Sequence, residues 1–205
     1  MKKLTLLLVV AMFMMATSAM ATPFSGELWS SNASAQNPAA GPAGILLGSF
    51  TVDKINFDTR TYGTDYDSWL QGSATNMNGL TWTSPIPVGF ISSNTTGTFM
   101  QITGTGYFGA NTLVTHDDGF SLSMANSVNT YYIDHSTPVS PTNDYLGNVA
   151  GVYDFTLNYG AWNGFPETLI ANNVAPVPEP GTMMLLGAGM LSLLVFGRRR
   201  MNNKA

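Results

Sequence analysis

Phe120-Ser121-Leu122-Ser123-Met124 is the stretch that most clearly decides the fold. Its apolar side chains at positions 120, 122 and 124 alternate with serines, which is the two-residue period of a strand with one buried face. The same alternation recurs in Phe155-Thr156-Leu157-Asn158-Tyr159. We therefore expect both stretches to be strands whose apolar side chains point into one core.

Further short segments rich in β-branched and aromatic residues lie on both sides of these two stretches. Each is bounded by residues that favour turns, namely Gly, Asn, Asp or Pro. The expected strands are 27–30, 45–57 (a strand or hairpin), one beginning at Trp69, 80–83, 86–91, 98–108, 112–116, 128–133, 152–159 and 168–171, with a long loop at 31–44. No segment of residues 22–175 shows a helical stripe. The sequence predicts an all-β domain, an antiparallel β-sandwich or jelly roll.

The N-terminus has the features of a secretory signal. Lys2 and Lys3 precede an apolar stretch from Leu4 to Met15, and Ala19-Met20-Ala21 has the small-x-small pattern that signal peptidase cuts. We expect a signal peptide over residues 1–21 and a mature chain that starts at Thr22.

The C-terminus, residues 176–205, divides into three parts. Val177-Pro178-Glu179-Pro180 comes first, an apolar segment over 182–197 is expected to be a short transmembrane helix, and Arg198-Arg199-Arg200 begins a basic end at 198–204. At about 1.5 Å per residue a helix of this length is shorter than the hydrocarbon core of about 30 Å. The arginines are expected to stay in the cytoplasm and stop the chain in the membrane.

This tail resembles the PEP-CTERM family, whose members carry a VPEP-type motif, a short membrane helix and an Arg-rich end. The resemblance implies that Val177 to Pro180 are the sorting motif and that an exosortase processes the tail. It also implies brief residence in the inner membrane, followed by delivery to the cell surface or to exopolysaccharide outside the cell. An ordinary single-pass anchor is the competing interpretation.

Charge is distributed unevenly along the chain. The total is −4, but the region from Glu27 to Glu179 holds twelve acidic residues against Lys54 and Arg60, a net charge of −10. Such a region lacks the basic surface that nucleic acids require, whereas it attracts divalent cations. The chain has no cysteine, which excludes disulfides and thiolate metal sites.

Asp117-Asp118-Gly119 is the sharpest candidate site. Two adjacent carboxylates followed by glycine, between two expected strands, would place hard oxygen ligands at the end of a sheet, and calcium prefers such ligands. The alternative is a plain hairpin turn, since Asp-Gly is a common turn dipeptide. Asp58, Asp65 and Asp67 form a second acidic cluster, which we expect to be a solvated loop because its spacing departs from known calcium loops.

The same stretch, together with the later segment from Tyr153 to Leu169, resembles the lectin domains of the protective-antigen and flocculin type. In the calcium-dependent members two aspartates bind the ion, and the ion helps to hold sugar hydroxyls. The resemblance implies that Asp117 and Asp118 are calcium ligands and that Asn163 is a ligand-binding residue in the neighbouring loop. It implies an adhesive or structural protein that contacts glycans.

Enzyme signatures are missing from the sequence. It has no Gly-x-Ser-x-Gly elbow, phosphate-binding glycine loop or His-Glu-x-x-His motif. We expect a protein without enzymatic activity. The alternative is a secreted polysaccharide hydrolase with two carboxylates across a cleft, drawn from Asp117, Asp134, Asp154 and Glu167. A metal or catalytic site at His116 or His135 with Asp134 is a remoter alternative.

Overall fold

The computed structural model describes residues 21–71, 81–82, 97–135, 142–178, 187, 189 and 190. Residues 23–177 form one compact unit, and residues 1–22 with 178–205 form a second. Residues 1–20 of the predicted signal peptide and the expected strand at 86–91 lie outside the described residues, as does nearly all of the predicted membrane segment 182–197. No helix among the described residues has the length and apolar character needed to cross a membrane.

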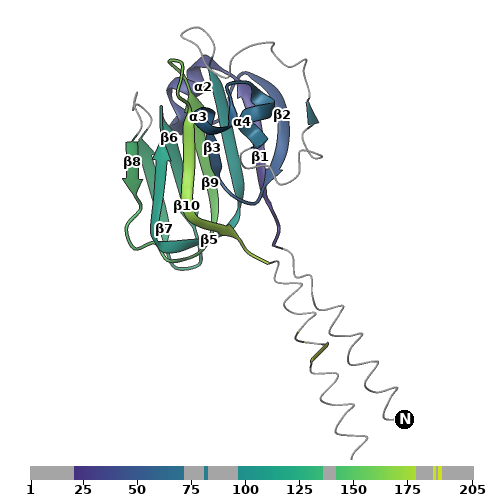
Figure 1. Cartoon of the computed structure of the whole chain (residues 1–205). Coiled ribbons are helices and arrows are strands. Elements are labelled where there is room, and N and C mark those ends of the chain that lie inside the picture. Colours follow the sequence, from purple (N-terminus) through teal and green to yellow (C-terminus); the bar gives the residue numbers. More distant parts are fainter. Residues whose placement is uncertain are drawn as a thin grey trace, which may run out of the picture. The chain divides into compact units, whose positions relative to one another are not determined.

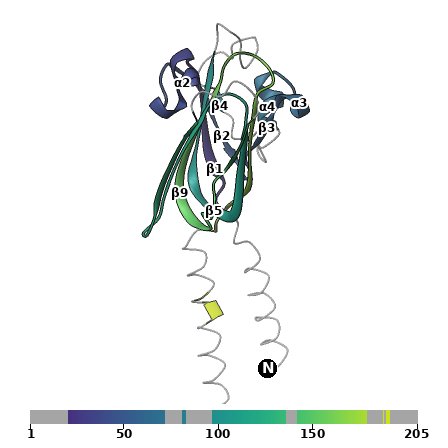
Figure 2. The same ribbon diagram turned by 90° about the vertical axis from the view of Figure 1, so that its left-hand side faces the viewer.

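Strand β5, Thr98–His116, is the centre of the fold. Its first half pairs with β1 (Phe24–Ser30) and β9 (Gly151–Ala161), and its second half pairs with β10 (Thr168–Pro176) and β8 (Thr142–Tyr145). One strand therefore belongs to both layers of an antiparallel sheet that folds over itself (Figures 1 and 2). The sequence analysis predicted two strands here, 98–108 and 112–116, separated at residues 109–111. In the structure they form one continuous strand.

The first layer has the strand order β4-β2-β1-β5-β9-β6-β7. Its other members are β2 (Ile45–Val52), β4 (Thr81–Trp82), β6 (Phe120–Ala125) and β7 (Thr130–His135). In the second layer β10 pairs with β5 and with β3 (Asn56–Asp58), and β8 pairs with the other edge of β5. The all-β prediction is confirmed, whereas the jelly-roll topology stays a prediction.

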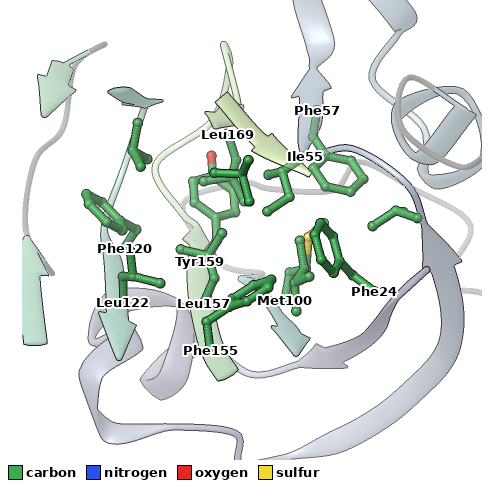
Figure 3. Close-up of a cluster of buried hydrophobic side chains, with 14 of the residues drawn as sticks. Phe24, Ile55, Phe57, Met100, Phe120, Leu122, Phe155, Leu157, Tyr159 and Leu169 are labelled. Atoms are coloured by element: carbon green, nitrogen blue, oxygen red, sulfur yellow. The ribbon is translucent and has the colours of Figure 1, made fainter. Parts of the chain in front are cut away.

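The core lies between the two layers. Phe120, Leu122 and Met124 of β6 are each at most 2 % exposed, as the two-residue period predicts, and the alternating residues of β9 are buried beside them (Figure 3). Aromatic side chains of the two layers pack against each other. For example, the rings of Phe50 in β2 and Phe57 in β3 lie 6.1 Å apart in a T-shaped arrangement. The stretches 120–124 in β6 and 155–159 in β9 are therefore adjacent strands that bury their alternating apolar side chains in the same core.

Short helices replace one expected strand. Trp69 lies in α4 (Tyr66–Gln71), which follows α3 (Thr59–Tyr62), so the strand predicted to begin at Trp69 is wrong. The helices form because aspartates cap them: Asp58 accepts the backbone N–H of Arg60 at 2.9 Å, and Asp65 accepts that of Ser68 at 2.9 Å. A single turn is enough to bury Trp69 completely.

The expected loop at 31–44 contains α2 (Asn32–Gln36) and the 3-10 helix η1 (Pro38–Ala40). Ser31 caps α2, because its hydroxyl accepts the N–H of Ser34 at 3.2 Å. Both helices lie against the outer face of the first layer, where Asn158 of β9 donates to the carbonyl of Pro38 at 3.1 Å. They cover one end of that face (Figure 2).

Candidate functional site

Asp117 and Asp118 lie in the tight connection between β5 and β6. The neighbouring strands hold this connection, because Asp117 N–H donates to the carbonyl of Thr168 at 2.9 Å and Gly160 N–H donates to that of Gly119 at 3.0 Å. Asp118 adopts a left-handed conformation with φ of 63°, which Asp tolerates better than most residues. The predicted sheet-end position of both aspartates is confirmed.

The carboxylate of Asp118 is enclosed by the loop that follows β9. It accepts the backbone N–H of Trp162 and, at 3.4 Å, the side-chain Nδ2 of Asn163. Both Asp117 and Asp118 are 4 % exposed. The structure therefore brings Asp118 and Asn163 together, although they are distant in sequence and are linked only by the pairing of β6 with β9.

Glu167 is a third acidic residue of this cluster. It is fully buried, and its Oε2 accepts the hydroxyl of Tyr159 at 3.0 Å. The sequence suggested Glu167 only as a hydrolase carboxylate, and nothing in its local pattern marks it as buried.

Burial dominates the electrostatics of the cluster. It raises the pKa of Asp118 to about 6, against the opposing effect of the Trp162 N–H, and it also raises the pKa of Asp117. The nearest arginine, Arg60, lowers the pKa of Asp117, but its guanidinium is held by Asp58 at 2.9 and 3.0 Å. The neighbouring His116 also lowers the pKa of Asp117, but burial outweighs both opposing effects.

The donor chemistry of the cluster fits calcium. Asp117 and Asp118 offer hard oxygen ligands, and desolvated carboxylates gain from an added cation. The amide of Asn163 presents its Nδ2 to Asp118, so it would have to turn over to offer its oxygen. In the part of the chain that the structure describes, no group of three or more His, Asp or Glu side chains is placed to hold a metal ion. A calcium site here would therefore need carbonyl oxygens or water in addition to the two aspartates.

A buried histidine links this turn to strand β8. The ring of His116 is fully buried, with Nδ1 2.6 Å from the carbonyl oxygen of Asp118 and Nε2 2.7 Å from Oδ2 of Asp144. The carbonyl oxygen and the carboxylate oxygen both accept hydrogen bonds. Either both ring nitrogens of His116 carry protons, or Nδ1 carries one and Asp144 carries the other. His135 Nδ1 lies 3.5 Å from the same carboxylate oxygen. The sequence analysis suggested Asp134 as the carboxylate partner of the histidines. In the structure His116 pairs with Asp144 instead.

The other suggested residues are dispersed. Asp58 caps α3 and is buried in an ion pair with Arg60, and Asp65 bonds to Ser68 in α4, so the expected solvated loop is two short helices instead. Of the four hydrolase carboxylates, Asp117 and Glu167 are buried, whereas Asp134 and Asp154 are exposed on the outer face of the first layer. The hydrolase alternative stays a prediction.

The C-terminal stretch provides the clearest comparison with known proteins. Residues 176–200 match the family model described as the PEP-CTERM protein-sorting motif. The chain carries a PEP-CTERM sorting motif. This motif indicates an exported protein that exosortase processes at a membrane, as the resemblance of the tail implied. Val177 and Pro178 directly follow β10, whereas Glu179, Pro180 and the arginines 198–200 lie outside the described residues.

Two solved structures of PA14 domains are similar to this chain. The PA14 domain of the antifreeze protein MpAFP shares 16 % identity at a TM-score of 0.41, over 78 % of this chain and 83 % of that one. The PA14 sugar-binding domain of an RTX adhesin shares 13 % identity at a TM-score of 0.42, over 77 % and 99 %. Both are protective-antigen-type domains, the group that the Asp117 stretch resembles. None of the curated proteins compared with the chain matches it.

Proposed function

We propose that the domain of residues 23–177 is a non-enzymatic, adhesive component of the material outside the cell, and that it contacts glycans there. The observation that carries this proposal is the sorting motif at 176–200, which follows directly on an acidic all-β domain. A domain that carries its own export and processing signal acts outside the cytoplasm. Its negative charge makes nucleic acid and anionic lipid poor partners.

Calcium is the cofactor that we propose for this domain. Asp117 and Asp118 would hold it, with Asn163 from the neighbouring loop. When bound, the ion would compensate the negative charge of the two desolvated carboxylates. These three residues join the β5–β6 connection to the loop after β9, so an ion held by them ties together two segments of the first layer.

Calcium should raise the melting temperature of the purified protein at pH 7.5. At a free concentration of about ten times the dissociation constant, the gain in unfolding free energy is about 1.4 kcal/mol. For a domain of this size that corresponds to a rise of about 3–6 °C. Scanning calorimetry with calcium, with magnesium and with a chelator measures the rise.

The double variant Asp117→Ala/Asp118→Ala should show no calcium-dependent rise. The matched control is Asp67→Ala, which removes an exposed carboxylate from α4 and should respond to calcium like the original protein. If the original protein melts at the same temperature with calcium and with chelator, no ion is bound and this part of the proposal fails.

Deletion of residues 177–205 should leave the domain folded but change its destination. The deleted segment contains the sorting motif and the arginines, so exosortase has no substrate to process. Cell fractionation and the mass of the mature protein report the result together: the full chain should be recovered outside the cell and shortened at both ends. Deletion of residues 201–205 alone is the control. Recovery of an unprocessed full chain from the inner membrane would contradict the proposed role.

A further inference from the structure

The outer face of the first layer carries an unbroken row of hydroxyl groups. In antiparallel sheets, directly paired residues point to the same face, so the register connects side chains across strands. Six consecutive paired positions, one on each of strands β2, β1, β5, β9, β6 and β7, all bear a hydroxyl group: Thr51, Ser25, Thr103, Thr156, Ser123 and Tyr132. We call these six residues the hydroxyl row.

The hydroxyl row is open to solvent and chemically unused. Ser25, Ser123 and Tyr132 are exposed, and the other three members are half-buried. Within the part of the chain that the structure describes, none of the six hydroxyl groups makes a hydrogen bond to the protein. By contrast, Thr105 donates to Asp154 at 2.5 Å, and Thr115 donates to Asn143 at 2.7 Å. The row thus offers donors and acceptors that the fold itself does not need.

The surroundings of the row define the surface further. On one side η1 covers the next row, where Asn158 and Ser121 are buried and bonded to each other at 3.3 Å. On the other side the next row holds Thr105, Asp154 and Ala125, and beyond it the paired residues Tyr107 and Val152 are 48 % and 45 % exposed. At one end of the hydroxyl row the ring of Tyr132 is 61 % exposed. The hydroxyl row is therefore a polar track between two largely polar rows, with aromatic surface at one end and further out on one side.

Charge narrows the choice of partner. The strands of the first layer contain no Lys or Arg, whereas Glu27, Asp134 and Asp154 lie on this face or at its border. This acidic face would repel an anionic polymer, and its strands offer no Lys or Arg side chain to bind one. Hydroxyl groups that donate and accept, with tyrosine rings for the flat faces of sugars, suit an uncharged carbohydrate.

We propose that the hydroxyl row binds an extended, neutral β-1,4-linked polysaccharide that lies across the strands. Neighbouring strands are about 4.8 Å apart, so six of them give a track about 24 Å long. Successive rings of an extended β-1,4-linked hexose chain are turned over relative to each other, so equivalent hydroxyls face the same side on every second ring. That repeat is close to two strand spacings, so alternate sugars can meet the row in register. This inference rests on the proposed adhesive function and assigns its ligand class and surface.

Binding of defined oligosaccharides to the full-length chain, purified in mild detergent, tests the proposal. The probes are cellohexaose and β-1,4-linked mannohexaose, with the corresponding dimers and hexamannuronate for comparison. Hexamannuronate keeps the linkage of mannohexaose but carries a carboxylate on every ring. Titration calorimetry should show binding to the neutral hexamers, weaker binding to the dimers, and none to the anionic hexamer.

The double variant Thr103→Val/Thr156→Val removes two hydroxyls from the middle of the row while keeping β-branched side chains. It should bind the neutral hexamers about tenfold or more weakly, because two hydrogen bonds are lost. The control is Thr115→Val, which makes the same change on the outer face of the second layer and should leave affinity unchanged.

Three outcomes would overturn the assignment: no binding of either neutral hexamer, equal or tighter binding of hexamannuronate, or unchanged affinity in the double variant. If sugar binding is lost instead in Asp117→Ala/Asp118→Ala and kept in the double variant, glycan contact stands and the hydroxyl row is the wrong surface. Failure of the proposed function itself appears separately, in the location of the chain and in its calcium response.

Discussion

The variant Asp118→Asn should be more stable than the original protein at pH 8 in calcium-free buffer. Burial raises the pKa of Asp118 from an ordinary 3.8 to about 6, so ionised Asp118 costs the folded state about 3 kcal/mol at pH 8. Asparagine has nearly the same shape and no charge. Asparagine has one acceptor oxygen where aspartate has two, so one of the hydrogen bonds from Trp162 and Asn163 is lost. This loss reduces the gain in stability by about 1 kcal/mol. The net gain of about 2 kcal/mol corresponds to about 4–8 °C.

The pH dependence of this gain identifies its cause. A carboxyl whose folded pKa lies above its unfolded pKa binds more protons in the folded state between the two values. The original protein should therefore lose stability relative to Asp118→Asn as pH rises from about 4 to about 6, and the difference should be constant above that range. Equal melting temperatures from pH 4 to pH 8 would show that Asp118 is not desolvated. Addition of calcium at pH 8 should make the original protein melt at a higher temperature than Asp118→Asn, because only the aspartate holds the ion.

Much of the β-structure could be predicted because it depends on local alternation. The serines between Phe120, Leu122 and Met124 reveal a strand with one buried face, and the structure buries all three apolar residues. Helix α4 could not be predicted in this way, because one turn is too short for a helical period to emerge. Its cap, Asp65, was read as an acidic loop residue, yet its carboxylate fixes the turn that buries Trp69.

The candidate site could be predicted only in part. Asp117 and Asp118 stand out as adjacent carboxylates before a glycine, which is a local signal. Glu167 joins them because β10 pairs beside β5, and this is a long-range consequence of register. The hydroxyl row has the same origin, since its six members come from six strands and no single strand reveals it. Sequence patterns show which side of a strand faces outward, but not which strands are neighbours.

The variant Gly160→Ala should destabilise the domain strongly. A Cβ atom at Gly160 would lie 2.0 Å from the carbonyl oxygen of Ala35 in α2 and 2.7 Å from its carbonyl carbon. Both are backbone atoms, so no side-chain rotation relieves the clash, and either α2 lifts from the sheet or β9 shifts. We expect a loss of about 3 kcal/mol, near the upper end for overpacking, and a fall of about 6–12 °C in melting temperature.

Gly106→Ala is the matched control for this effect. There the added Cβ would meet only ring carbons of Phe155 and Phe24, at 3.3 Å, and aromatic side chains can move by the few tenths of an ångström required. Its loss of stability should be much smaller. Hydrogen exchange separates the two mechanisms further, because the N–H of Ala35, bonded to the Ser31 carbonyl at 3.0 Å, should lose protection in Gly160→Ala but not in Gly106→Ala. Equal stability of the two variants would mean that α2 does not rest on β9, and η1 would then no longer border the hydroxyl row.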